Sequence, residues 1–315
     1  MIVVESLDRV PEGVRPSAVT IGKFDGVHAG HRAVIGALLE EAARRGVTPV
    51  VVTFDRNPLA VLRPEACPQN LVSLPQKLEL LEEAGVAATV VLAFDHRLAS
   101  WTPEEFAERV LATALEARVV LVGDDFRFGA GGAGNVETLR ELGRLHGFEV
   151  VVVGDVVSEG GRASSSRIRA LLDEGDVDGA AILLGRAPRV RGVVVPGLRR
   201  GRELGYPTAN LAAESEGLAP GDGVYAGWLT DRSAPGTPRY PAAISVGTNP
   251  TFGDVARKQV EAYVLDEDLD LYGHLVDVEF AHRLRGMVAY EGIGPLIEQM
   301  GRDVSQARTL LAAQA

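Results

Sequence analysis

Hydrophobic and polar positions follow two different patterns in the two halves of this 315-residue chain. In the first half, short apolar runs alternate with segments whose apolar residues recur every three or four positions. Residues 48–54, TPVVVTF, form a β-branched run that is typical of a strand buried on both faces. Residues 31–45 place apolar side chains at i, i+3, i+4 and i+7 from Ile35, which predicts one helical stripe.

The same reading extends along the first half as an alternation of strands and helices. Strands are predicted at residues 18–21, 48–54, 89–94, 119–123 and 149–153. Helices are predicted at residues 31–45, 75–84, 102–115 and 135–145. This order predicts a doubly wound, Rossmann-like parallel sheet, in which ligands bind beyond the carboxyl ends of the strands.

The second half is richer in short β-type runs separated by Gly, Pro and Asp. Two short helices are predicted at residues 167–172 and 177–184, and a final helix at residues 293–313. Strands are predicted at residues 190–195, 223–229, 242–246, 259–265 and 276–280. We therefore expect an α/β domain over residues 1–185 and a small antiparallel β-barrel with a terminal helix over residues 186–315.

Composition narrows the classes of protein that remain. The formal net charge of −11 argues against broad nucleic-acid binding. Cys67 is the only cysteine, so the chain forms no internal disulfide, as is typical of a reducing compartment. No signal pattern or membrane-length apolar run is present. We expect a soluble cytoplasmic protein, whose oligomeric state the sequence does not determine.

The segment GKFDGVHAGH at residues 22–31 lies between a predicted strand and a predicted helix. Its glycines let the backbone approach an anion, and the start of the helix adds free N–H groups. His28 and His31 can donate hydrogen bonds to phosphate oxygens that gain charge during reaction. The alternative is a flexible turn with two surface histidines.

Three more polar segments follow predicted strands or begin a predicted helix. They are TFDRNP at residues 53–58, VGDDFRFG at residues 122–129 and SSSRIR at residues 164–169. The last segment offers three hydroxyls and two guanidinium groups, which suit a polyphosphate. Its alternative is an ordinary helix cap in a polar linker.

These four segments resemble the nucleotidyltransferase module of bacterial FAD synthetases. That family carries G-x-F-D-G-x-H-x-G-H, T-F-x-P-H-P, V-G-x-D-F-x-F-G and S-S-T-x-I-R. The chain departs from the second pattern, where Arg56 and Asn57 replace Pro and His, and from the fourth, where Ser166 replaces Thr. Asn57 keeps a hydrogen-bonding side chain but loses the option of positive charge.

The second half resembles the riboflavin kinase domain. It contains GYPTANL at residues 205–211, GVYA at 223–226, GTNPTF at 247–252, VEAY at 260–263 and DLYG at 270–273. Together the halves are similar to bifunctional riboflavin kinase/FMN adenylyltransferases. The family usually continues after LR with an acidic residue and Lys-Phe, whereas residues 286–290 read GMVAY here.

The resemblance implies a kinase site that takes ATP with Mg²⁺. Thr208 and Asn210, two residues apart in an extended segment, would contact the metal and the phosphates. Gly197, Gly201 and Gly205 would let the loop fold over ATP. Glu261 is the candidate base for the riboflavin hydroxyl. The alternatives are a capped turn after Pro207 and a solvated strand carboxylate.

In the transferase site, the resemblance implies that the FMN phosphate attacks the α-phosphate of a second ATP. His28 and His31 would brace the phosphates, and the outgoing pyrophosphate would be held at the start of the helix. The ATP-binding residues expected in this half are Gly22, Phe24, Gly30, Ser164, Ser165, Ser166 and Arg169.

Flavin contacts are expected from residues of both halves. The candidates are Asn57, Asp125, Phe126, Phe128 and Tyr225. Core packing is an equally good explanation of the three aromatic side chains.

Three hypotheses about function remain open on the sequence alone. The first is a bifunctional enzyme that uses ATP to convert riboflavin to FMN and then FMN to FAD. The second keeps only the kinase, with the transferase weakened by Asn57. The third is a non-catalytic protein that senses flavin or nucleotide. Retention of His28, His31 and Glu261 favours the first.

Overall fold

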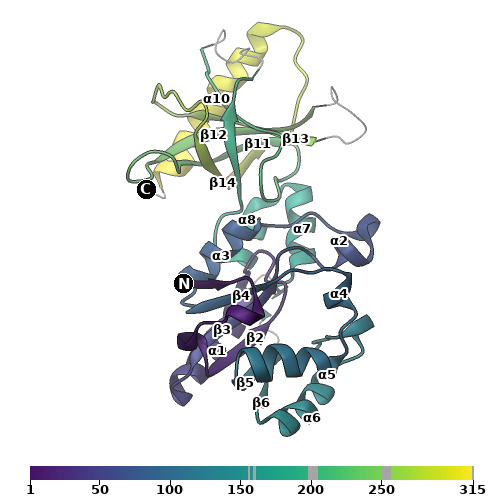
Figure 1. The fold of residues 1–315 in the computed structure, drawn as a ribbon. Coiled ribbons are helices and arrows are strands. Elements are labelled where there is room, and N and C mark those ends of the chain that lie inside the picture. Colours follow the sequence, from purple (N-terminus) through teal and green to yellow (C-terminus); the bar gives the residue numbers. More distant parts are fainter. Residues whose placement is uncertain (155–156, 159–160, 198–204, 250–256, 314–315) are drawn as a thin grey trace. The chain divides into compact units, whose positions relative to one another are not determined.

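A computed structural model describes residues 1–154, 157–158, 161–197, 205–249 and 257–313 of the chain. The chain divides into two compact units, Met1–Ala163 and Ser164–Ala315 (Figure 1). Each unit has its own sheet and its own hydrophobic core.

The first unit is built on a six-stranded sheet in the order β1-β4-β3-β2-β5-β6. The strands are β1 (Ile2–Val4), β2 (Ser17–Ile21), β3 (Thr48–Phe54), β4 (Ala88–Leu92), β5 (Ala117–Gly123) and β6 (Glu149–Val153). Every neighbouring pair is parallel. The predicted doubly wound sheet is confirmed, and the edge strand β1 is an element that the hydrophobic pattern did not predict.

Helices enclose both faces of this sheet, which explains the apolar runs of its strands. They are α1 (Ala29–Arg45), α2 (Leu59–Leu62), α3 (Leu74–Glu83), α4 (His96–Ala99), α5 (Pro103–Phe106) and α6 (Val136–His146). Short 3-10 turns occur at Leu7–Arg9, Glu12–Val14, Pro64–Ala66 and Ala130–Gly132, and a small hairpin pairs β7 (Val157–Ser158) with β8 (Gly161–Arg162). Ala18 and Val51 pack with α1 and α3, whereas Val19 and Val50 pack with α5 and α6 on the other face.

The predicted helix at residues 102–115 begins as expected but changes its winding. Thr102 and Glu105 form a reciprocal capping box, and Pro103 occupies the first turn. From Ala107 to Ala114 the segment is a π-helix, and Leu115 N donates to Val110 O (3.1 Å). The predicted helix is therefore present, and the structure adds that its second part is wound as a π-helix.

The second unit contains a closed antiparallel barrel in the order β10-β13-β12-β11-β14-β9, as predicted. Its strands are β9 (Arg189–Val195), β10 (Ala209–Leu211), β11 (Gly223–Asp231), β12 (Arg239–Asn249), β13 (Arg257–Val264) and β14 (Leu275–Arg285). The short strand β10, which the sequence reading missed, closes the barrel by pairing with β9 and β13.

Among its described residues, the second unit also contains the helices α7 (Ser165–Glu174), α8 (Val177–Leu184) and α10 (Ile293–Ala312). Ala307 and Leu311 of α10 pack against Ala226 and Trp228 of β11. Helix α8 packs on β14, where His282 contacts Asp178 (2.7 Å). The second compact unit therefore includes α7 and α8, which precede residue 186. The predicted division of the chain into two functional modules at residues 185/186 stays a prediction.

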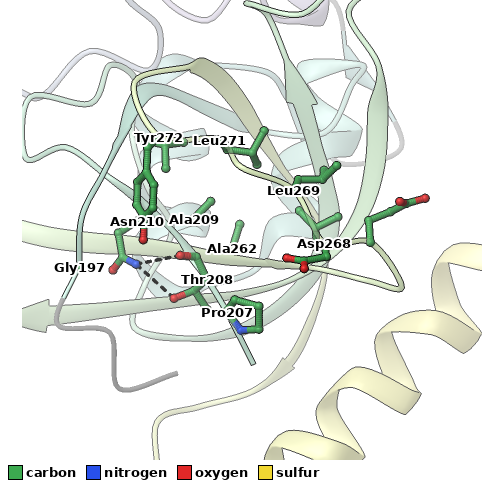
Figure 2. A pocket seen from close by; sticks show the side chains of 13 residues that line it. Gly197, Pro207, Thr208, Ala209, Asn210, Ala262, Asp268, Leu269, Leu271 and Tyr272 are labelled. Atoms are coloured by element: carbon green, nitrogen blue, oxygen red, sulfur yellow. Dashed lines mark hydrogen bonds between the residues drawn. The ribbon is translucent and has the colours of Figure 1, made fainter. Parts of the chain in front are cut away.

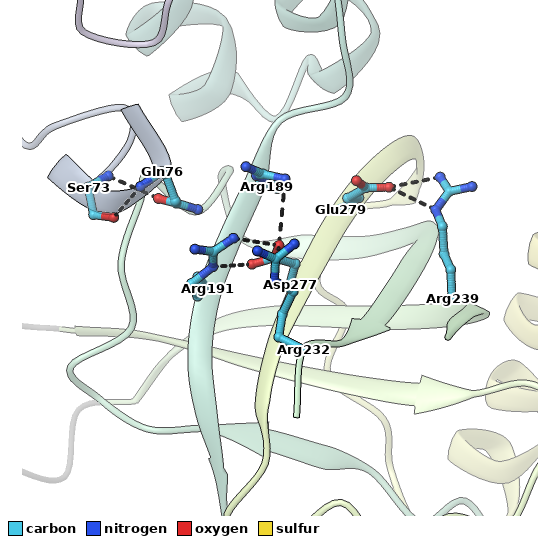
Figure 3. A network of polar contacts seen from close by, with 8 residues as sticks. All are labelled: Ser73, Gln76, Arg189, Arg191, Arg232, Arg239, Asp277 and Glu279. Atoms are coloured by element: carbon cyan, nitrogen blue, oxygen red, sulfur yellow. Dashed lines mark hydrogen bonds and ion pairs between the residues drawn. The ribbon is translucent and has the colours of Figure 1, made fainter. Parts of the chain in front are cut away.

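A buried ion pair links two neighbouring strands of the barrel (Figure 3). Arg191 of β9 donates to both carboxylate oxygens of Asp277 on β14 (2.6 and 2.9 Å). Arg189 and Arg232 lie 3.5 and 3.9 Å from the same carboxylate. Asp277 is almost fully buried, so the bidentate geometry is needed to offset the loss of its hydration.

Across the described part of the chain, no helix has the length and apolar character required to cross a membrane.

Gly227 of β11 lies close to the backbone of β14, with which β11 pairs. A Cβ atom there would overlap the carbonyl oxygen of Glu279. We therefore expect Gly227→Ala to lower the free energy of unfolding of the second unit by at least about 2 kcal/mol, because the backbone must move apart. Denaturant unfolding followed by Trp228 fluorescence, in a Trp101→Phe background, measures this.

Gly294→Ala in α10 is the matched control, since a Cβ at Gly294 meets nothing within 4 Å. It should leave stability unchanged or raise it by up to about 1 kcal/mol. An unfolding midpoint of Gly227→Ala equal to that of the control would contradict the close packing of β11 and β14.

Candidate active sites

The segment at residues 22–31 forms a tight turn between β2 and α1. His28 is the N-cap of α1, and its Nδ1 accepts a hydrogen bond from His31 N (3.4 Å). The two imidazole rings stack with centroids 3.8 Å apart. The turn therefore brings the two predicted histidines into contact, while their joint action on a ligand stays a prediction. Because Nδ1 of His28 is an acceptor, its Nε2 carries the proton when the ring is neutral.

The backbone of this turn is strained at two positions. Phe24 and Val27 have φ angles of 48° and 39° although neither is glycine, and both side chains are buried. A β-branched residue is rarely found in this region of φ. Such strain persists only where the surrounding structure holds it, and it is concentrated at functional sites.

Burial keeps His31 neutral. Its pKa lies well below the usual value, first because the ring is desolvated and then because of the positive charges of His28, Lys77 and Lys23. The buried Nδ1 of His31 has no hydrogen-bond partner among the described residues. His31 can therefore offer a neutral ring to a ligand but is not an acid near neutral pH.

Two of the glycines in this turn have a specific steric role. A Cβ at Gly30 would lie 3.3 Å from the His28 ring, and one at Gly22 would lie 3.1 Å from the Phe24 ring. The glycines thus make room for the side chains that shape the turn, in addition to the close anion approach expected from the sequence.

The segment after β3 holds Asn57 in a local hydrogen bond. Its Oδ1 accepts from Leu59 N (3.1 Å), which starts the short helix α2. Asp55 accepts from Phe94 N (2.8 Å) and from Arg56. Asn57 and Asp55 line a small cavity together with Lys23, Asp25 and Lys77.

Phe126 and Phe128, the aromatic residues that follow β5, differ in how deeply they are buried. Phe128 is buried in the core, stacked on Phe126 and edge-on to Phe106. Phe126 is half-buried and Asp125 is exposed, so both remain accessible to a ligand. For Phe128, core packing is the better account.

Ser164 is the N-cap of α7, Ser165 and Ser166 begin its first turn, and Arg169 lies at the start of the second turn, all in the second compact unit. Ser164 Oγ accepts from Arg167 N (3.2 Å). Ser164 thus acts as a helix cap, and a phosphate-binding role for this segment stays a prediction.

In the barrel, strand pairing brings the predicted kinase residues together. Asn210 of β10 is opposite Glu261 of β13 in the register. Thr208 Oγ1 donates to Glu261 Oε2 (3.3 Å). The Asn210 amide donates to Thr208 Oγ1 (3.2 Å), as Figure 2 shows. Gln259 Nε2 donates a hydrogen bond to Asn210 Oδ1 (3.1 Å). The result is a connected row of oxygen and amide groups.

Glu261 is half-buried, and burial raises the pKa of its carboxyl, while the Thr208 hydrogen bond partly offsets that rise. This makes Glu261 a stronger base than an exposed glutamate, since a raised pKa means a higher proton affinity. The alternative of a fully solvated strand carboxylate does not match this placement.

Two pockets meet at Thr208. One is lined by Gly197, Thr208 and Asn210 together with Asp268, Leu271 and Tyr272 (Figure 2). The other, of about 260 Å³, is mainly apolar and is lined by Tyr206, Tyr263, Met287, Tyr290 and Glu261, among others.

The two described glycines of the predicted kinase loop, Gly197 and Gly205, are needed for different reasons. A Cβ at Gly197 would collide with the Asn210 amide, so this glycine is required for the loop to pass the site. Gly205 has a φ of 84°, which only glycine adopts without strain. Gly201 and residues 250–252 of the GTNPTF segment lie outside the described residues.

Tyr225, expected to contact flavin, is fully buried inside the barrel. Its ring packs edge-on against Phe280, and its hydroxyl donates to Gly221 O. This placement leaves no ring surface for a ligand and does not support a flavin contact. The aromatic residues that do line the apolar pocket, Tyr206, Tyr263 and Tyr290, were missed. Tyr290 lies in the segment whose sequence departs from the family pattern.

The oxygen atoms of Thr208 and Asn210, with Glu261 nearby, suit a hard divalent cation such as Mg²⁺ carried by a nucleotide. Nowhere in the described residues do three or more His, Cys, Asp or Glu side chains form a group able to hold a metal.

Comparison with known families covers both halves of the chain. A family model described as FAD synthetase matches residues 11–167, and one described as riboflavin kinase matches residues 184–311. A crystal structure from Streptococcus pneumoniae, described as a macrolide-efflux protein, has a TM-score of 0.86 and 31% identity, and the match covers 98% of both chains.

Curated relatives match over nearly their whole length. Bifunctional riboflavin kinase/FMN adenylyltransferases from Escherichia coli (strain K12) and Pseudomonas fluorescens are each 34% identical, covering 97% and 100% of this chain and 95% and 99% of theirs. The Bacillus subtilis (strain 168) protein of the same description is 31% identical over 95% of this chain and 93% of its own. The chain therefore belongs to the family of bifunctional riboflavin kinase/FMN adenylyltransferases.

Proposed function

We propose that this chain transfers the γ-phosphate of ATP to riboflavin, forming FMN, and then transfers AMP from a second ATP to FMN, forming FAD and pyrophosphate. The observation that supports this proposal is that each unit contains a group of predicted site residues whose side chains contact one another. The first unit holds the stacked pair His28–His31, and the second holds Thr208, Asn210 and Glu261 in mutual hydrogen-bond reach.

For the kinase, we propose that the apolar pocket takes the flavin ring and the neighbouring polar pocket takes ATP. Thr208 lines both pockets, so a riboflavin hydroxyl and a γ-phosphate would meet beside it. Glu261 lines the apolar pocket and would accept the proton of the attacking hydroxyl. Thr208 and Asn210 would bind the phosphates and the accompanying Mg²⁺, which neutralises charge on the transferred group.

For the transferase, the nucleophile is the phosphate of FMN, which is already anionic, so no strong base is required. Catalysis would come from positioning and from stabilisation of the charge that develops on the α-phosphate oxygens. We propose that His28, through its Nε2 proton, and His31 contact those oxygens, beside Gly22, Phe24 and Gly30.

The remaining transferase contacts are proposed by resemblance. Ser164, Ser165, Ser166 and Arg169 would bind the pyrophosphate end of ATP at the start of α7, where free N–H groups and a guanidinium favour an anion. Asn57, Asp125 and Phe126 would orient the flavin or its phosphate. Residues 1–185 would form the transferase module and residues 186–315 the kinase module.

Asn57 supports a second candidate function, a riboflavin kinase that lacks the transferase activity. The family has His at this position, and Asn57 Oδ1 is already committed to Leu59 N. Chromatography of the products formed from riboflavin, ATP and Mg²⁺ separates the cases. FAD supports the bifunctional enzyme, FMN alone supports the kinase, and unchanged riboflavin contradicts both.

We predict that His28→Ala stops FAD formation from FMN and ATP, with turnover reduced at least about 10²-fold, because a charge-stabilising donor is lost. Riboflavin phosphorylation should continue at the wild-type rate. Both rates are measured by chromatography of the flavins. His96→Ala, on exposed α4, is the control and should change neither rate.

A parallel loss of both activities in His28→Ala would refute two separate catalytic sites.

We predict that Glu261→Gln lowers the turnover of riboflavin phosphorylation by about 10²-fold or more, since the amide cannot accept the hydroxyl proton. FMN adenylylation in the same variant should be unchanged, which also shows that the chain is folded. Glu279→Gln, on β14 beside Arg239, is the matched control. Wild-type phosphorylation by Glu261→Gln would remove Glu261 from the mechanism.

A further inference from the structure

Lys77 is a buried lysine that none of the proposed catalytic steps uses. It lies on α3, is only 9% exposed, and is one of three lysines in a chain whose other basic residues are arginines or histidines. A fully buried lysine needs partners for its ammonium group, because an isolated buried charge is very costly.

The ammonium group of Lys77 has three partners, all of them protein oxygens. Nζ donates to the carbonyl oxygens of Lys23 (3.2 Å) and Phe54 (3.0 Å) and to Thr53 Oγ1 (3.2 Å). Because an ammonium carries three N–H donors, none remains for a substrate. Lys77 therefore acts through other residues.

Those partners belong to two separate segments of the first unit, the turn after β2 and the end of β3. Lys23 directly precedes Phe24, the first strained residue of the His28 turn, whereas Thr53 and Phe54 end β3. Thr53 Oγ1 also donates to Lys23 O (3.2 Å), so two donors converge on this one carbonyl. The Leu71 N–H fixes the next part of the turn by donating to Asp25 Oδ1 (2.9 Å).

A turn with positive φ at Phe24 and Val27 relaxes unless it is held from outside. Relaxation would move the N-cap His28 and, with it, the His31 ring stacked on it. We propose that Lys77 is a positioning residue of the transferase site, whose ammonium ties the strained His28 turn to the end of β3. This inference rests on the proposed adenylyltransferase function.

The charge of Lys77 is part of this arrangement. Burial lowers the pKa of its ammonium to about 8, while Asp25 and Asp55 act in the opposite direction. Lys23 and His31 are the other titratable groups that face it, and the positive charge of Lys77 helps to keep His31 neutral. A neutral amine has one donor fewer and cannot serve all three oxygens.

The test is Lys77→Met in the full-length chain, with FMN adenylylation and riboflavin phosphorylation measured separately. We expect kcat for adenylylation to fall about 10²-fold, because misplacement of the histidines by about 1 Å is enough for such a loss. The KM values for FMN and ATP should change less than about threefold, since Lys77 contacts neither. Riboflavin phosphorylation should be unchanged.

Lys258→Met is the matched control, because Lys258 also donates to backbone carbonyls, those of Ala219 and Pro220, but in the second unit. It should leave adenylylation unchanged. If Lys77→Met misfolds and loses both activities, Thr53→Val is the variant that tests the positioning role of Lys77. This variant removes one acceptor of Lys77 and one donor to Lys23 O and should lower adenylylation kcat about 3- to 10-fold.

Hydrogen–deuterium exchange of residues 22–31 provides a readout that does not depend on activity. We expect faster exchange of this segment in Lys77→Met, or in Thr53→Val if the first variant misfolds, and unchanged exchange in β5. If the wild-type protein makes no FAD, the proposed function is refuted. The exchange rates of residues 22–31 would still show whether Lys77 holds this turn in place.

The pH profile adds a second readout that a purely structural lysine would not move. Wild-type adenylylation kcat should fall as pH rises through about 8, where the ammonium loses its third donor. Because burial lowers the pKa of Lys77 in the folded state, its deprotonation above about pH 8 adds to folding stability, so the titration of Lys77 does not itself unfold the protein. Unchanged kcat and unchanged exchange in a folded variant would overturn the proposal.

Discussion

Strand register is the constraint on which both sites depend. In the first unit, β2 and β3 are buried on both faces, and their pairing continues past β2 through Gly22 N and Val52 O (3.0 Å). In the barrel, the pairing of β10 with β13 sets Asn210 opposite Glu261. A slip of one residue would reverse the faces of a strand and separate these groups.

Burial then sets the chemistry of the side chains that register brings together. Desolvation lowers the pKa of His31 and raises that of Glu261, so that both favour the neutral form. One consequence is a neutral imidazole beside the strained turn; the other is a carboxylate with increased proton affinity beside Thr208. The same residues on an exposed surface would have neither property.

The sequence predicted the architecture well because period and composition differ so clearly between the halves. The parallel sheet, the barrel and the terminal helix followed from alternating elements and short β runs, while β1, β10 and the π-helical turn after Phe106 did not. Three-residue strands are too short to show a period. Among site residues, Thr208, Asn210 and Glu261 are brought together as expected, whereas Tyr225 packs inside the barrel.

The sequence by itself determined the motifs, the fold class and the residue types available for phosphate and flavin chemistry. Tertiary structure alone decided which aromatic side chains face a pocket and that Lys77 joins a turn and a strand end about 30 residues apart in sequence. The physical reason is that burial and donor–acceptor pairing depend on the elements packed around a side chain. A lysine in an amphipathic helix has the same local pattern whether its amine reaches water or three buried oxygens.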